Sequence, residues 1–122
     1  MADTQDRVPT VYIENGNVVN LDQKDPIEVS FRGNFEGEPT GLKNPELLSM
    51  VWHHGHNGSI VNGVPRIGFQ RGGKNAMWSD VDMADKFLDE AKKYISSVKD
   101  EPFFLFYTCL LYTSDAADDC WS

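Results

Sequence analysis

The clearest pattern in the chain is an amphipathic helix over about residues 79–99. Apolar side chains recur there at steps of three and four residues, which places them on one helix face. Ser79 or Asp80 is suited to cap the start of this helix, and Pro102 follows its end. The stripe comprises Met83, Ala84, Phe87, Leu88, Ala91, Tyr94, Ile95 and Val98.

An apolar run without polar alternation, Phe103–Tyr107, follows the helix. Such a run is typical of a central strand whose sheet is covered by helices on both faces, as in α/β proteins. The chain offers only one helix and a few short strands to cover it. Exposing five large apolar side chains costs several kcal/mol at ~25 cal/mol per Å². We therefore expect an incomplete domain, which aggregates or stays molten when isolated.

The first third of the chain predicts β structure. Val11–Glu14 and Asn17–Val19 flank Asn15-Gly16, the preferred two-residue loop of a β-hairpin. In Pro26–Phe31 apolar and polar residues alternate, which predicts a half-buried strand.

The middle of the chain is rich in loop formers. Residues 32–44 read as a connector, and Pro45–Met50 predicts one or two helical turns with Asn44 as the cap. Trp52–Trp78 is Gly-rich and lacks a helical period, which predicts a long irregular segment. Such segments in compact proteins tend to carry function.

Composition limits the possible partners. The 122 residues carry a net charge of −8, with 40% hydrophobic and 25% charged residues, as in one ordinary globular domain. No apolar stretch approaches the roughly 20 residues of a membrane span, and Met1–Asp6 does not resemble a signal peptide. The acidity, with no offsetting Lys/Arg stripe, argues against nucleic acid as a partner.

The last 14 residues differ from the rest. They hold both cysteines, Cys109 and Cys120, and the order from Cys109 to Asp118 resembles a translated adapter used to prepare sequencing libraries. We expect residues 1–108 to be a partial domain and 109–122 to be a non-native tail, the alternative being a genuine C-terminal tail. Removing the three aspartates of the tail changes the net charge from −8 to −5.

The three histidines, His53, His54 and His56, form one cluster. In an extended chain His54 and His56 lie on the same side and could share a metal or an anionic ligand. No Cys or acidic residue stands nearby at ligand spacing, so hydrogen bonds to the backbone are the simpler interpretation.

Residues 68–75 nearly fit the phosphate-binding loop of nucleotide-binding proteins. The match is incomplete, because Asn75 stands where the pattern requires the hydroxyl of Ser or Thr and no apolar strand precedes Gly68. A weaker hypothesis is that Arg71 and Lys74, beside Gly72-Gly73, bind an oxyanion. The alternative is a glycine turn with two solvated cations.

Three stretches together resemble bacterial arylsulfatase-type sulfatases, which have the alkaline-phosphatase-like fold. The first two, the more specific, are residues 6–15 and residues 55–68 continued by Gly72-Gly73-Lys74. The third is Asp82–Asp85 with the helix and Pro102–Tyr107. The resemblance covers about residues 6–108. It implies an α/β fragment with a β-hairpin, a long Gly-rich loop, one amphipathic helix and one central strand, but not a complete domain.

The resemblance implies hydrolysis of aryl or carbohydrate sulfate esters by a periplasmic or secreted enzyme. It also implies a calcium ion and a formylglycine matured from a Cys/Ser-x-Pro-x-Arg motif. That motif does not occur in this sequence, so we expect no catalytic residue, no bound cofactor and no activity of the chain alone. We expect substrate-binding residues at the rim of the pocket, namely His54, His56, Lys74 and Arg71, and a sulfated small molecule or glycan as the partner.

Two alternatives remain open. One is a fragment of a related phosphodiesterase or phosphonate hydrolase, which shares the helix and last strand. The other is a small acidic binding module without enzymatic activity.

Overall fold

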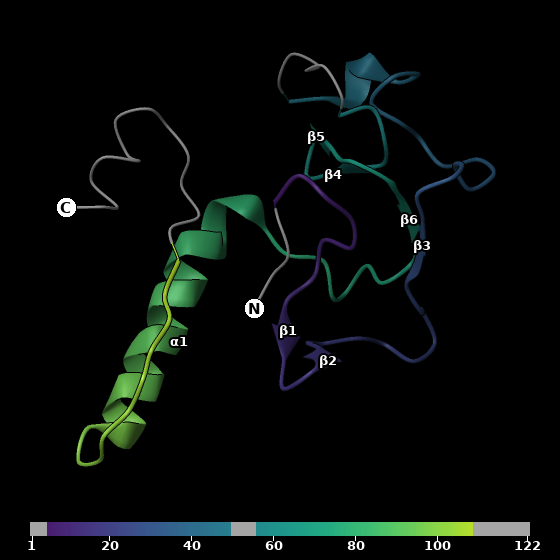
Figure 1. Ribbon diagram of the computed structural model, residues 1–122. Helices are drawn as coiled ribbons and strands as arrows, with labels where there is room; N and C mark the ends of the chain where they lie inside the picture. The colour runs from purple at the N-terminus through teal and green to yellow at the C-terminus, as the bar shows by residue number, and fades with distance from the viewer. Residues whose placement is uncertain (1–4, 50–55, 109–122) are drawn as a thin grey trace. The chain divides into compact units, whose positions relative to one another are not determined.

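The computed structural model describes residues 5–49 and 56–108, which belong to two compact units, Met1–Asp80 and Val81–Ser122 (Figure 1). The predicted division at residue 108 stays a prediction, because residues 109–122 lie outside the described part. The elements are β1 (Ile13–Glu14), β2 (Asn17–Val18), β3 (Glu28–Ser30), the 3-10 helix η1 (Pro45–Leu47), β4 (Ile60–Val61), β5 (Val64–Pro65), β6 (Phe69–Arg71), the 3-10 helix η2 (Asp80–Asp82) and α1 (Met83–Val98).

The predicted N-terminal hairpin is confirmed. Strands β1 and β2 pair antiparallel, with Ile13 opposite Val18. Asn15 and Gly16 both have positive φ, at 50° and 80°. This is the backbone that a two-residue hairpin loop requires, and Asn and Gly adopt it at the lowest steric cost.

The prediction that residues 52–78 are irregular throughout is wrong. Strands β4 and β5 form a second antiparallel hairpin around Asn62-Gly63, whose φ angles are 55° and 73°. Strand β6 lies in the same stretch. Two-residue strands are too short to show alternation, so only the Asn-Gly pair could have identified this hairpin.

The strand predicted over 26–31 forms as β3 and pairs antiparallel with β6, placing Glu28 opposite Arg71. The predicted half-burial holds for Ile27 but not for Val29 and Phe31, which are exposed. This sheet has two strands in the described chain.

The core of the first unit forms where the N-terminal segment meets residues 67–78. Arg7 bridges Ile67 in parallel, and the Trp78 N–H donates to the carbonyl of Thr10. The buried apolar residues are Val8, Val11, Val61, Ala76 and Trp78, and they share the interior with the polar Thr10, Thr40, Ser59, Arg66 and Gln70. The interior is therefore held by hydrogen bonds as well as by apolar packing.

Both predicted helical segments are present. A single 3-10 turn, η1, falls within residues 45–50, but Asn44 makes no side-chain cap; its Oδ1 accepts from the Thr40 N–H instead. The long helix α1 begins at Met83 with Asp82 as the N-cap, rather than at Ser79 or Asp80. The Asp80 carboxylate binds Arg66, and Asp82 makes no side-chain hydrogen bond that caps α1.

The predicted central strand at Phe103–Tyr107 does not form. This segment has no assigned strand and runs back along α1, where Phe103 packs edge-on against Tyr94 with ring centroids 5.8 Å apart (Figure 1). A strand requires hydrogen bonds to a neighbouring strand, and in the described residues none pairs with it. Phe104 and Phe106 are 83% and 79% exposed. None of the described helices is long and apolar enough to cross a membrane.

We expect the exposed phenylalanines to make the chain self-associate and bind hydrophobic dyes. A Phe104→Ser/Phe106→Ser variant should bind less of a hydrophobic dye and stay dispersed at higher concentration, because it removes the most exposed part of the apolar run. Dye fluorescence and light scattering measure both properties. Leu42→Ser, at an exposed leucine of the first unit, is the control and should change little. Equal dye binding by the double variant and the unaltered chain would contradict this prediction.

Candidate functional site

His56 and Asp6 form a pair in the first unit. The imidazole Nε2 lies 3.2 Å from Asp6 Oδ2, with 29% and 47% of the two side chains exposed. Asp6 and Gly58, which is two residues after His56, are hydrogen-bonded to the same short stretch of backbone. The Ile67 N–H donates to the carbonyl of Asp6 at 2.6 Å, and the Gly58 N–H donates to that of Arg66 at 2.8 Å. These bonds bring Asp6 and the chain just after His56 to the same stretch, residues 66–67.

Arg71, at the end of β6, binds Glu28 across the β3–β6 pair. Its Nε donates to Glu28 Oε2 at 2.6 Å, and its Nη2 contacts the same oxygen. The guanidinium carbon also lies 4.7 Å from the centroid of the Phe35 ring. An internal carboxylate and an aromatic face therefore hold this half-exposed cation.

The glycine turn before Lys74 already binds a carboxylate of its own chain. Asp25 Oδ2 accepts from the Lys74 N–H at 2.9 Å, and the Asp25 carbonyl accepts from the Gly73 N–H at 3.1 Å. A Cβ on Gly72 would lie 2.1 Å from the carbonyl oxygen of Pro26. These glycines thus allow the turn to lie directly against the backbone of residues 25–27.

The predicted site residues fall into two places. His56 contacts Asp6, whereas Arg71 contacts Glu28 across the β3–β6 pair. Arg71 and Lys74 lie near the same end of β6. His54 lies outside the described residues.

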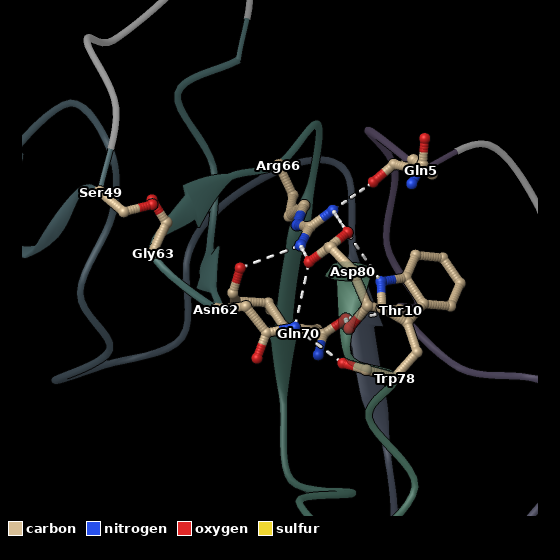
Figure 2. Close-up of polar contacts among 10 residues, drawn as sticks. Gln5, Thr10, Ser49, Asn62, Gly63, Arg66, Gln70, Trp78 and Asp80 are labelled. Atoms are coloured by element: carbon tan, nitrogen blue, oxygen red, sulfur yellow. Dashed lines mark hydrogen bonds and ion pairs between the residues drawn. The ribbon is translucent and has the colours of Figure 1, made fainter. Parts of the chain in front are cut away.

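The polar centre of the first unit is Arg66, which the sequence-based prediction missed (Figure 2). Its side chain is 1% exposed and binds Asp80 through two hydrogen bonds, Nη2–Oδ2 at 2.5 Å and Nη1–Oδ1 at 3.1 Å. Nη1 also donates to the carbonyl of Gln5, and Nη2 to that of Val61 at 2.9 Å. An arginine flanked by the apolar residues Pro65 and Ile67 was the one available signal.

Asp80 is surrounded by donors. Asn62 Nδ2 donates to Asp80 Oδ2 at 3.0 Å and to the Trp78 carbonyl at 2.7 Å, and Trp78 Nε1 donates to Asp80 Oδ1 at 3.2 Å. Burial by itself raises the pKa of Asp80, but these hydrogen bonds and the charge of Arg66 outweigh it, so the pKa lies below its usual 3.8. The pair is a structural anchor held in its ionised form.

The described residues hold no group of three or more His, Cys, Asp or Glu side chains arranged to bind a metal. They do not fit a calcium site of the kind that the resemblance implies, so no metal-dependent step is assigned to this part of the chain.

No profile of a known protein family matches the chain. The chain is 52% identical over 103 residues, 84% of its length, to an N-acetylgalactosamine-6-O-sulfatase of Bacteroides thetaiotaomicron, and it spans 20% of that protein. The chain is homologous to a segment of a sulfatase. A solved sulfatase structure from a study of glycosaminoglycan metabolism in the same organism superposes with a TM-score of 0.81 and 52% identity, covering 84% of this chain and 21% of that one.

These similarities confirm the resemblance to sulfatases and the assignment to part of an α/β fold, and they do not favour the phosphodiesterase or the binding module. Since the chain spans about a fifth of its relative, its residues are best tested in a chimera. In this chimera, the matched residues replace their counterpart in the Bacteroides sulfatase.

We expect Asp80→Asn to lower the free energy of unfolding of this sulfatase chimera by about 3 kcal/mol at pH 7, because it leaves the buried Arg66 without its charge partner. A lowered pKa means that folding favours the ionised carboxylate. The contribution is therefore present above pH 3.8 and lost as the pH falls through the lower folded pKa.

Denaturant titrations of the chimera with and without Asp80→Asn, at pH 7 and near pH 3, measure the difference in the free energy of unfolding. Glu28→Gln, which breaks the exposed pair with Arg71, is the control and should cost less than about 1 kcal/mol. An Asp80→Asn variant as stable as the unaltered chimera at pH 7 would refute the role of the pair.

Proposed function

We propose that this chain forms part of the catalytic domain of a sulfatase that hydrolyses carbohydrate sulfate esters. The observation that carries the proposal is 52% identity sustained over 84% of the chain, together with a TM-score of 0.81. The names of the two relatives favour N-acetylgalactosamine 6-sulfate groups of glycosaminoglycans as the substrate class. Aryl sulfates are the alternative.

The reactive groups of such an enzyme would come from outside this chain. The sequence has no Cys/Ser-x-Pro-x-Arg motif from which a formylglycine matures, and the described residues offer no metal-binding group. Formylglycine supplies the nucleophile and calcium binds the sulfate oxygens in the family that the chain resembles. The proposed enzyme is bacterial and either periplasmic or secreted, which gives it access to sulfated glycans.

The proposed contribution of this segment is contact with substrate through His54, His56 and Lys74, with Arg71 behind them. Lys74 is the strongest candidate for the sulfate, because its side chain is exposed and has no carboxylate partner among residues 5–49 and 56–108. Arg71 is already bound to Glu28, so its role is to support the turn that presents Lys74.

The sulfatase chimera tests the proposal directly. We expect it to fold and to release sulfate from N-acetylgalactosamine 6-sulfate with kcat/KM within about tenfold of the Bacteroides enzyme, a loss of less than 1.4 kcal/mol in transition-state binding. Sulfate release measures activity, and the Bacteroides enzyme lacking the segment is the negative control. A chimera that melts cooperatively but hydrolyses no sulfate ester would contradict the proposed function.

Within this chimera, Lys74→Ala should raise KM by roughly tenfold and leave the melting temperature unchanged, because it removes one charge-assisted contact to the sulfate. Initial rates over a range of substrate concentrations separate KM from kcat. Lys92→Ala, at an exposed lysine of α1, is the matched control. Equal KM values for both variants would remove Lys74 from the proposed site.

A further inference from the structure

The chain contains three Asn-Gly pairs, at residues 15–16, 57–58 and 62–63. In such a pair the glycine has no side chain to shield its backbone nitrogen, so this nitrogen can attack the amide of the asparagine side chain. Two of the pairs are hairpin loops with similar backbones, with φ of 50° and 80° at residues 15–16 and of 55° and 73° at residues 62–63. The surroundings of each pair therefore decide which amide can react.

The amide of Asn62 is held in place. Its Nδ2 donates to the Trp78 carbonyl at 2.7 Å and to Asp80 Oδ2 at 3.0 Å (Figure 2). The Gly63 carbonyl accepts from the Ser49 N–H at 2.9 Å, and a Cβ on Gly63 would lie 2.8 Å from Ser49 Oγ. Rotation of the Asn62 amide toward the Gly63 nitrogen would break both of its hydrogen bonds, which raises the barrier to attack.

Asn57 is exposed, but the nitrogen that would attack it is held by the fold. The Gly58 N–H donates to the Arg66 carbonyl at 2.8 Å, and Gly58 is buried. A Cβ on Gly58 would lie 1.9 Å from the Gly68 carbonyl oxygen, so the backbone here is closely packed. Attack on Asn57 would first require this hydrogen bond to break and the packed backbone segments to separate.

Asn15 and Gly16 are both exposed, and neither restraint acts on them. Among residues 5–49 and 56–108, no hydrogen bond engages the Asn15 side chain or the Gly16 N–H. A Cβ on Gly16 would meet nothing within 4 Å. Asn17 Nδ2 donates to the Asn15 carbonyl at 3.2 Å. This hydrogen bond stabilises the negative charge that the peptide group carries when the Gly16 nitrogen loses its proton.

We propose that Asn15 is a site of spontaneous deamidation, whereas Asn57 and Asn62 are protected by the fold. The Gly16 nitrogen loses its proton to solvent base and attacks Asn15 Cγ. The new N–Cγ bond closes a succinimide ring, the Cγ–Nδ2 bond breaks, and the nitrogen of the side chain leaves as ammonia. Water then adds to one of the two imide carbonyls and opens the ring, which gives aspartate or isoaspartate.

Either product adds a negative charge to the β1–β2 hairpin. Isoaspartate also places Cβ in the main chain, which lengthens the two-residue loop and weakens the pairing of β1 with β2. This inference goes beyond the proposed sulfatase function and does not depend on it.

Peptide mass spectrometry of the chain incubated in mildly alkaline buffer tests the inference. The Phe104→Ser/Phe106→Ser chain suits the experiment, because its changes lie outside the first unit and favour dispersion. We expect Asn15 to deamidate at least about tenfold faster than Asn57 or Asn62, a factor that one or two broken hydrogen bonds account for. The same chain in concentrated urea is the reference, in which the three pairs should react at comparable rates.

Two variants of this chain complete the test. Asn15→Gln should remove most of the ammonia released in buffer, because attack on the longer side chain must close a larger ring. Asn57→Gln, at the other exposed amide, is the matched control and should leave the release unchanged. Comparable rates at the three pairs in buffer, a faster reaction at Asn57 or Asn62, or undiminished ammonia release from Asn15→Gln would overturn the inference. None of these outcomes bears on the sulfatase function.

Discussion

The buried charge of Arg66 is the constraint on which the first unit depends. A guanidinium that is 1% exposed must be bound on nearly all sides, and its partners come from distant parts of the chain: the Gln5 carbonyl, the Val61 carbonyl and the Asp80 carboxylate. Meeting that requirement fixes the N-terminal segment, the β4–β5 hairpin and the end of the unit in one arrangement. Removing either charge would leave the other uncompensated in the interior, which is far more costly than breaking a surface pair.

The glycines of residues 58–73 follow from the same close packing. A Cβ on Gly58 would lie 1.9 Å from the Gly68 carbonyl oxygen, and one on Gly68 would lie 2.7 Å from both Val8 and Phe31. By contrast, a Cβ on Gly33 would meet nothing within 4 Å. The glycine richness therefore permits backbone segments to pass in direct contact, and it does not mark a loose loop.

The sequence predicted those structural elements that depend on residues close together in the chain. The Asn15-Gly16 hairpin and the α1 helix were predictable, because a turn dipeptide and an apolar period of three to four residues can both be recognised in a short stretch of sequence. The β3–β6 pairing and the Arg66–Asp80 and Asp6–His56 contacts join residues 14 to 50 positions apart, and no short pattern encodes them. The prediction of a central strand at Phe103–Tyr107 was wrong for a related reason. Its apolar residues favour burial, but the described chain supplies no strand to pair with it. The sequence singled out His56, Arg71 and Lys74 as polar groups in a Gly-rich segment. It did not predict that Asp6 contacts His56, that Glu28 contacts Arg71 or that Asp25 accepts from the Lys74 backbone N–H.

The carboxylates that contact these side chains limit how this acidic segment can bind an anion. Arg66, Arg71 and His56 each face an internal carboxylate, and the N–H groups of the glycine turn bind Asp25. Among the three Lys and Arg side chains of residues 66–74, only that of Lys74 has no carboxylate partner in the described part of the chain. A sulfate ester bound beside this segment would need most of its positive counter-charge from the rest of the enzyme, with Lys74 as the local contribution.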